Sequence, residues 1–184
     1  MKLLRFTPLL VTGAFLLSLS LGTHAADLPT QAGVDLNKYA GEWHEVARLP
    51  LKYEDECTAD VRATYVLNED GSLKVLNQCQ IADGSINSAE GEGRLAAVGE
   101  GSDPSKLEVR FAPGWLSWLP MVWGDYWILK VEGDYEYSLV GSPDLEYLWL
   151  LSRTTSPDEA VVNDLLNYAQ ELGFSLEEII RTPM

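Results

Sequence analysis

Positive charge, cysteine and histidine are all scarce in this chain of 184 residues. Lys and Arg together number 13 against 28 for Asp and Glu, which gives a formal net charge of -15 at pH 7. Such a chain repels the phosphates of DNA and RNA, so a role in binding nucleic acid is excluded, and attraction to anionic lipid head groups is disfavoured. With two cysteines, two histidines and no cysteine pair at metal-ligand spacing, neither a metal site nor a cofactor is expected.

What is present indicates one globular domain behind an export signal. Glycine and proline number only 15 and 9, and 46% of the residues are hydrophobic, which favours a folded core over a disordered or fibrous chain. Residues 1–25 have the pattern of a secretory signal peptide: Lys2 and Arg5 precede the uncharged apolar stretch Leu9–Leu21. That stretch is short for a membrane span, so a retained anchor is the weaker interpretation. The domain is expected to cover residues 26–184.

The expected export affects the redox state of the two cysteines. Cys57 and Cys79 flank a hairpin signal at 68–71, and an even cysteine count in an oxidising compartment favours a disulfide. A turn centred near Asp70 leaves Cys57 a few residues beyond the partner of Cys79, so a bulge or loop at Cys57 is needed. Two free buried thiols are the alternative. No cysteine lies near the cleavage junction, so lipid attachment there is not expected.

Strand signals follow one another along the chain, separated by short turns rather than helices. This spacing predicts an all-β fold, an eight-stranded antiparallel up-and-down β-barrel, with a β-sandwich as the alternative. The expected strands are Gly41–Arg48, Thr58–Leu67, Ser72–Ile81, Glu90–Val98, Lys106–Phe111, Asp125–Glu132, Glu136–Gly141 and Tyr147–Arg153.

One α-helix is expected after the last strand. Ser156 opens a capping box with Pro157 at the first helical position, and Gly173 supplies the stop. Apolar residues recur on one face of this segment, which predicts that the helix packs against the outside of the sheet. The final segment, Ser175–Met184, is expected to add a short extended piece.

Three ordered motifs resemble those of the lipocalin family. Gly41 and Trp43 form the Gly-x-Trp of the first motif, Gly133-Asp134-Tyr135 resembles the second, and the segment ending in Arg153 resembles the third. The likeness covers the whole chain after the signal and is strongest to the branch of bacterial outer-membrane lipocalins and apolipoprotein D. It implies a calycin barrel in which Trp43 and Arg153 pack together at the closed end, the guanidinium over the indole. Structural rather than ligand-binding roles are implied for Gly41, Trp43, Asp134, Tyr135 and Arg153.

Alternation along the strands predicts the cavity lining. Taking Trp43 and Arg153 as inward places Glu45 and Ala47 inward on the first strand. A buried Glu45 must be hydrogen-bonded, paired with a cation such as Arg62 or Arg110, or protonated, and we expect a partner near the closed end, with Arg153 as the candidate. A solvated carboxylate on an opened strand edge is the alternative. A closed core filled by side chains is the alternative to a cavity. The resemblance also supports four of the expected ligand-binding residues, which together are Glu45, Tyr65, Asn77, Trp149 and Leu151.

The connection between the fifth and sixth strands is rich in tryptophan. Trp115, Trp118 and Trp123 lie in a segment broken by prolines, and an up-and-down barrel places this connection at its open end. These side chains are expected to surround the cavity mouth, where they would contact a membrane transiently or admit a lipid. Packing of the loop on the barrel rim is the alternative.

The function predicted from these residues is binding, not catalysis. We expect a periplasmic carrier, free or associated with the outer membrane, that binds a fatty acid, lysophospholipid or similar small hydrophobic molecule. An enzyme acting on a lipid-like substrate is disfavoured, because His44 faces outward and Glu45 alone does not make an acid–base pair. A partner-binding domain that uses the tryptophan loop is a third reading. The sequence leaves open whether the protein is a monomer or a dimer.

Overall fold

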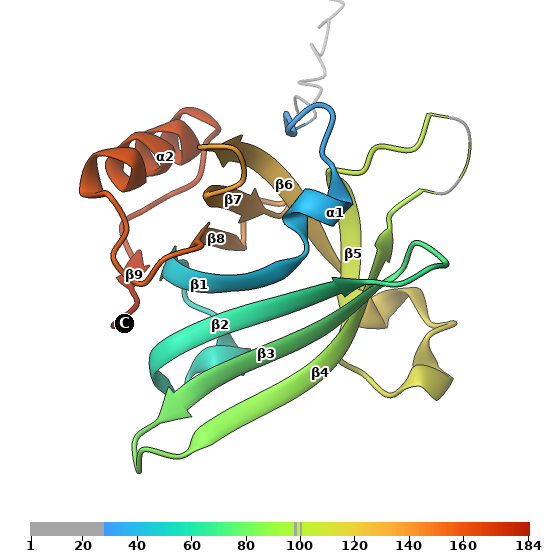
Figure 1. The fold of residues 1–184 in the computed structure, drawn as a ribbon, viewed down its shortest axis with the longest axis horizontal. Helices are drawn as coiled ribbons and strands as arrows, with labels where there is room; N and C mark the ends of the chain where they lie inside the picture. Colours follow the sequence, from blue (N-terminus) through green and yellow to red (C-terminus); the bar gives the residue numbers. More distant parts are fainter. Residues whose placement is uncertain (1–27, 98, 100) are drawn as a thin grey trace, which may run out of the picture.

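Eight antiparallel strands close into a barrel in the computed structural model, which describes residues 28–97, 99 and 101–184 (Figure 1). The expected signal peptide, residues 1–25, lies outside the described residues. Each strand pairs with the next in sequence, and β1 pairs with both β2 and β8, so the predicted barrel is confirmed and the sandwich is wrong. The strands are β1 (Gly41–Arg48), β2 (Cys57–Leu67), β3 (Leu73–Ile81), β4 (Ile86–Leu95), β5 (Lys106–Arg110), β6 (Gly124–Glu132), β7 (Tyr137–Gly141) and β8 (Leu148–Ser152).

Strand β4 begins four residues earlier than the sequence indicates. It starts at Ile86 instead of Glu90, immediately after a tight turn in which Gly84 has a φ of +83°. The added residues are exposed and carry no apolar alternation, so hydrophobic patterning gives no sign of them. Backbone pairing with β3 continues through this polar segment and extends the hairpin.

Apolar side chains form two layers, one inside the barrel and one between its outer wall and α2 (Glu159–Glu171). The outer layer joins Val162, Leu165 and Ala169 of the helix to outward residues of β1, β6, β7 and β8. The predicted helix is therefore confirmed, and it packs where expected. Its start is not at Pro157, because Asp158 is the N-cap and accepts a hydrogen bond from the Ala160 amide at 2.8 Å.

The C-terminal segment completes the wall where β1 and β2 diverge. The pairing of β1 with β2 covers only Gly41 to His44, and beyond this point the short strand β9 (Ile180–Arg181) pairs with β1 instead. The Asp60 amide on β2 donates to the Pro183 carbonyl at 2.9 Å, which ties the same segment to the other strand. The expected extended piece in this segment is confirmed.

The disulfide between Cys57 and Cys79 is present and joins β2 to β3, with a Cα–Cα distance of 5.5 Å. The register of the two strands shifts between Cys57 and Ala59 and again before Arg62, which supplies the irregularity that the sequence required. The alternative of two free thiols is wrong.

A short helix, α1 (Leu36–Tyr39), precedes β1 and covers the closed end of the barrel (Figure 1). Asp35 caps it by accepting a hydrogen bond from the Asn37 amide at 2.9 Å. Within the part of the chain that the structure describes, no helix is both long and apolar enough to cross a membrane.

Candidate ligand-binding site

The closed end is held by Trp43 and Arg153. Trp43 is fully buried, its Nε1 donates to the Tyr39 carbonyl at 2.8 Å, and the Arg153 Cζ lies 3.7 Å from the centre of its ring. The guanidinium also donates to the backbone carbonyls of Glu42, Lys38 and Ala40 at 2.7–2.9 Å. The cation–π contact that the resemblance implied is thus part of a larger clasp between β1, α1 and the end of β8.

A glycine is needed at position 41 for steric reasons. Its φ is +103°, and a Cβ at this position would lie 3.1 Å from the Arg153 Nη1. A side chain here would be strained by the backbone angle and would also crowd the guanidinium. The glycine two residues before Trp43 therefore makes room for the cation that covers the indole.

The turn between β6 and β7 closes the same end. Gly133, Asp134 and Tyr135 all have positive φ, at 62°, 52° and 71°. Asp134 pairs with the Lys38 Nζ at 2.8 Å, and the Tyr135 hydroxyl accepts a hydrogen bond from the Asp35 amide at 2.7 Å. Both side chains hold α1 against the closed end of the barrel.

Three tyrosine hydroxyls meet across the middle of the barrel. The Tyr126 hydroxyl lies 2.8 Å from that of Tyr39 and 2.9 Å from that of Tyr65, and Tyr39 also contacts the Ser138 Oγ at 3.0 Å. Burial raises the pKa of Tyr39 to about 12 and raises the pKa values of Tyr65 and Tyr126 well above the ordinary value of a phenol, so all three remain protonated. The network forms an uncharged polar floor between the closed end and the open half.

Four of the residues predicted to face the interior do face it, above this floor. Tyr65 and Leu151 are buried with the interior cluster, and Trp149 packs against it while remaining partly exposed. The Trp149 ring stacks on Tyr126 and on Tyr147, with centroids 6.3 and 6.0 Å away. Asn77 lies opposite Ala63, and its buried Oδ1 has no hydrogen-bond partner among the described residues.

Glu45 faces the interior but has a different partner from the one expected. Arg48 Nε lies 3.4 Å from Glu45 and 2.8 Å from Glu54, which belongs to the short 3-10 turn η1 (Lys52–Glu54), and Thr182 donates to the Glu45 carboxyl. The expected partners Arg62, Arg110 and Arg153 are wrong, since Arg153 lies at the closed end over Trp43. Burial, and then the nearby Glu54 carboxylate, raise the pKa of Glu45 to about 8.

A bulge in β1 explains both this pairing and the misplacement of Ala47. The register against β8 shifts between Glu45 and Ala47, so strict alternation fails there. Ala47 faces outward into the layer beneath α2, and Arg48, opposite Trp149, turns toward the interior. The expectation that Ala47 lines the cavity is therefore wrong.

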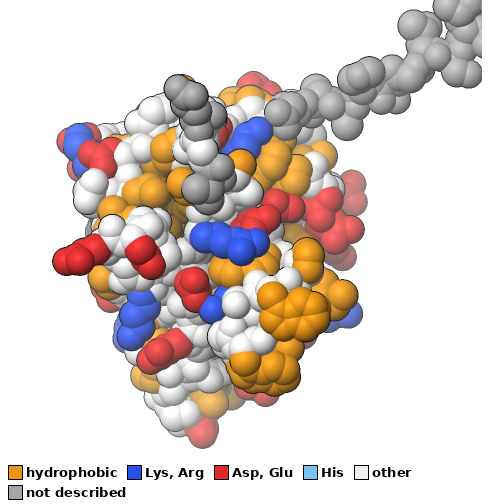
Figure 2. All heavy atoms as spheres, turned by 90° about the vertical axis from the view of Figure 1, so that its right-hand side faces the viewer, with side chains coloured by type: hydrophobic (Ala, Val, Ile, Leu, Met, Phe, Trp, Pro, Cys, Tyr) orange, Lys and Arg blue, Asp and Glu red, His pale blue; other side chains and the backbone are white. Residues whose placement is uncertain are grey.

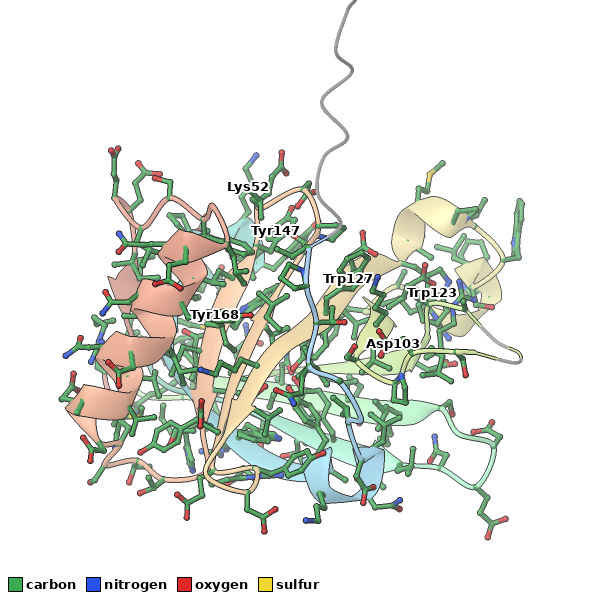
Figure 3. The ribbon with its side chains drawn as sticks, turned by 90° about the horizontal axis from the view of Figure 1, so that it is seen from above. Lys52, Asp103, Trp123, Trp127, Tyr147 and Tyr168 are labelled. Atoms are coloured by element: carbon green, nitrogen blue, oxygen red, sulfur yellow. A yellow bond between two sulfur atoms is a disulfide. The ribbon has the colours of Figure 1, made fainter. Side chains whose placement is uncertain are left out.

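The tryptophan loop does not direct all its rings toward the mouth. Trp115 and Trp118 are exposed, and Figure 2 shows hydrophobic side chains gathered on the face that this loop forms. Trp123 instead turns back onto the outer wall, where its ring lies 3.8 Å from Arg94 and 5.1 Å from Arg110. It lies on the side of the barrel opposite α2 (Figure 3). The expectation that Trp123 lies at the mouth is therefore wrong. This residue packs on the barrel instead, as the alternative proposed.

Comparison with known families agrees with the geometry. The family model described as a lipocalin-like domain matches residues 34–184, which is most of the chain. The chain belongs to the lipocalin family. The three motifs that suggested this family in the sequence lie together at the closed end, where the structure brings β1, the β6–β7 turn and the end of β8 into contact.

This lipocalin has relatives in several kingdoms. It is 36% identical to temperature-induced lipocalin-1 of Arabidopsis thaliana, over 88% of this chain and 85% of the relative. It is 37% identical to apolipoprotein D of Macaca fascicularis over 76% and 71%, and 29% identical to outer membrane lipoprotein Blc of Escherichia coli over 96% of each. Insecticyanin from the tobacco hornworm Manduca sexta has the same fold, with a TM-score of 0.68 at 22% identity, covering 86% of this chain and 85% of insecticyanin.

Sequence reasoning missed three interior residues of this lipocalin. Tyr126 follows an inward alternation that continues to Ile128, so strand parity alone could have found it. Arg48 becomes inward only through the bulge, and Glu54 comes from a connecting turn. Neither position has a periodic signal in the sequence, because each depends on how β1 bends against β8 and β9.

Proposed function

We propose that this lipocalin binds a small hydrophobic molecule with one polar end, such as a fatty acid or a lysophospholipid, in the open half of its barrel. The observation that carries the proposal is the environment of Trp149. Its neighbours Leu148 and Leu150 face α2 and are 1% and 0% exposed, whereas the inward indole stays partly exposed. A large apolar ring that faces the barrel interior without being fully covered is accessible to an apolar ligand.

Apolar side chains surround Trp149 above the tyrosine floor. Val75 and Leu151 are 2% and 4% exposed in the interior cluster, and the partly exposed Trp149 ring stacks on Tyr126, so an acyl chain would contact Trp149 first and reach the others by displacing side chains. Because burial keeps the tyrosines protonated, the floor places no charge against an apolar chain. The ligand would therefore lie with its apolar end toward Tyr65 and Tyr126 and its polar end toward the open mouth.

Polar groups near the mouth would orient the other end of the ligand. The Asn77 Oδ1 is a buried acceptor that lacks a partner among the described residues, so a hydroxyl or amine on the ligand would satisfy it. Arg48 supplies the cation at this level of β1, next to Glu54 and to a Glu45 whose raised pKa keeps it protonated at pH 7. A carboxylate or phosphate head group would compete with Glu54 for Arg48.

The proposal includes a location in the cell envelope. Two relatives are named outer membrane lipoproteins, those of Escherichia coli and Vibrio cholerae. For this chain, cleavage of residues 1–25 would release the domain into the periplasm. There it would carry its ligand, with transient contact to a membrane, in envelope maintenance or stress.

The test is a titration of the full chain, expressed with its own leader, purified after export and delipidated. Lysophosphatidylcholine and oleate are added separately while tryptophan emission is followed. We expect saturable binding that Trp149→Ala weakens by about tenfold, because removing a stacked ring costs roughly 1.4 kcal/mol. Trp127→Ala is the matched control, since Trp127 lies on the outer face against Lys106. No binding of either lipid by a folded β-rich protein would refute the proposal.

A second candidate, an enzyme acting on a lipid-like substrate, rests on Glu45. The structure shows that Glu45 is not alone, because Glu54 and Arg48 lie beside it, and a carboxyl with a pKa near 8 is protonated in the range where a general acid operates. Binding is favoured over this candidate because Glu45 is only 2% exposed, beneath Arg48 and Thr182. Mass spectrometry of lysophosphatidylcholine after incubation decides it: product formed by the native protein but not by Glu45→Gln would establish catalysis.

A further inference from the structure

The loop between β5 and β6 exposes several large apolar side chains close together in the sequence. Trp115, Trp118 and Met121 are 76%, 75% and 84% exposed, and Phe111 at the base of the loop is also exposed. Figure 2 shows hydrophobic side chains gathered on the face of the molecule that this loop forms. An apolar patch of this kind marks a surface that meets something less polar than water.

The loop holds this patch out by its own structure. Trp123 is fixed to the barrel wall by Arg94 and Arg110, and its Nε1 donates to the Ser117 carbonyl at 2.8 Å. The 3-10 turns η2 (Gly114–Leu116) and η3 (Pro120–Val122) lie between Phe111 and Trp123 and pair many of the backbone amides internally, at 2.9–3.3 Å. A loop whose backbone is paired in this way enters a membrane interface at lower cost than an open one.

Charge decides which apolar partner fits. From Phe111 to Gly124 the sequence has no Asp, Glu, Lys or Arg, although the chain as a whole carries -15. The two cations under the loop are already paired, Arg94 with Glu108 at 2.8 Å and Arg110 with Glu92 at 2.5 Å. Nothing at the patch therefore offers positive charge to an anionic lipid, and the net charge of the chain opposes one.

We propose that Trp115, Trp118 and Met121 dock this lipocalin on lipid surfaces whose head groups are zwitterionic or uncharged. Tryptophan favours the boundary between head groups and hydrocarbon, where its ring is buried and its N–H stays hydrated. The loop joins the ends of β5 and β6 at the mouth of the barrel, so docking places the mouth beside the membrane. The inference deepens the proposed function, because it names the surface at which the ligand is exchanged.

Vesicle flotation tests this surface directly. The exported full chain is mixed with vesicles of phosphatidylcholine alone, and with vesicles in which one third of the lipid is phosphatidylglycerol. We expect flotation and a blue shift of tryptophan emission with the first, and weaker binding to the second at low salt. Trp115→Ser combined with Trp118→Ser should lower partitioning by about tenfold or more. Val66→Ser, which removes an exposed apolar side chain on β2, is the control that should leave it unchanged.

Three results would overturn the inference. They are no flotation with phosphatidylcholine, equal flotation of the double variant and the native protein, and stronger binding when phosphatidylglycerol is added. Sedimentation equilibrium covers a further outcome: a dimer that the double variant converts to a monomer, with no vesicle binding, would assign the patch to a second copy of the chain and also refute docking. Ligand binding is measured separately, by titration without vesicles. Trp149→Ala should lose ligand binding and still float with vesicles. Either proposal can therefore fail without the other.

Discussion

The two ends of the barrel interior are built on opposite principles. At the closed end Trp43 is fully buried, its N–H is bonded, and Arg153 donates to several backbone carbonyls around it. In the open half Trp149 is partly exposed, the Asn77 Oδ1 has no partner among the described residues, and Glu45 is a buried carboxyl whose pKa is raised. The closed end stabilises the fold, while the open half leaves polar and apolar groups unsatisfied, which is where the proposed ligand would bind.

Truncation at the closed end should give the largest effect. Trp43→Ala removes a fully buried ring together with its hydrogen bond and its cation–π contact. We expect the free energy of unfolding to fall by about 3–5 kcal/mol, measured by urea denaturation. Trp149→Ala is the matched change in the open half and should cost clearly less. Equal losses for the two variants would show that the ends do not differ in packing.

Removing the disulfide should have the second largest effect on stability. The bond between Cys57 and Cys79 spans 22 residues and holds β2 to β3 in the open half, where the strand register is irregular. Replacing both cysteines by alanine should lower the free energy of unfolding by about 3 kcal/mol, chiefly by releasing the unfolded chain. Urea denaturation of the double variant, beside the native protein with and without reductant, measures it. A native protein that is unaffected by reductant while the variant is destabilised would assign the loss to packing instead.

The sequence predicted the closed end more completely than the open half. Gly41, Trp43 and Arg153 belong to short motifs that resemble those of the lipocalin family, so their arrangement at the closed end was recognisable from the sequence. Strand parity also identified Tyr65 and Trp149 as inward residues. Regular alternation is enough for both, because β2, β3 and β8 are regular near these positions.

Parity failed where the backbone departs from a regular strand. The bulge in β1 reverses the directions of Ala47 and Arg48, and no residue in Val46–Arg48 marks it in the sequence. Glu54 comes from the turn after β1 and pairs with Arg48, and Thr182 reaches Glu45 from the C-terminal segment, which lies there because β9 pairs with β1. Trp123 similarly bends to the outer wall because two arginines on neighbouring strands attract its ring.

The buried carboxyl should give the open half a pH dependence that the closed end lacks. Because the pKa of Glu45 is raised to about 8 in the fold, its contribution to stability is complete below the unfolded pKa of about 4.3 and is lost as pH rises toward 8. Glu45→Gln is neutral throughout and should escape this loss. Between pH 5 and pH 6.5 we expect the native protein to lose roughly 2 kcal/mol relative to the variant, since each pH unit between the two pKa values corresponds to about 1.4 kcal/mol. Parallel urea denaturation at each pH measures the difference, and identical slopes would contradict it.

The smallest expected effect tests whether the unsatisfied groups of the open half serve binding at the expense of stability. Asn77→Leu replaces the buried, unpartnered Oδ1 with an apolar side chain of similar volume, so the cost of desolvating the amide disappears. We expect a gain of about 1 kcal/mol in the free energy of unfolding, with weaker binding of lysophosphatidylcholine in the same preparation. Gln78→Leu, on the neighbouring outward position of β3, is the control for a polar-to-apolar change without an effect on ligand. If Asn77→Leu destabilises the protein, the Oδ1 has a partner in solution, such as an ordered water, and the open half is better satisfied than its contacts indicate.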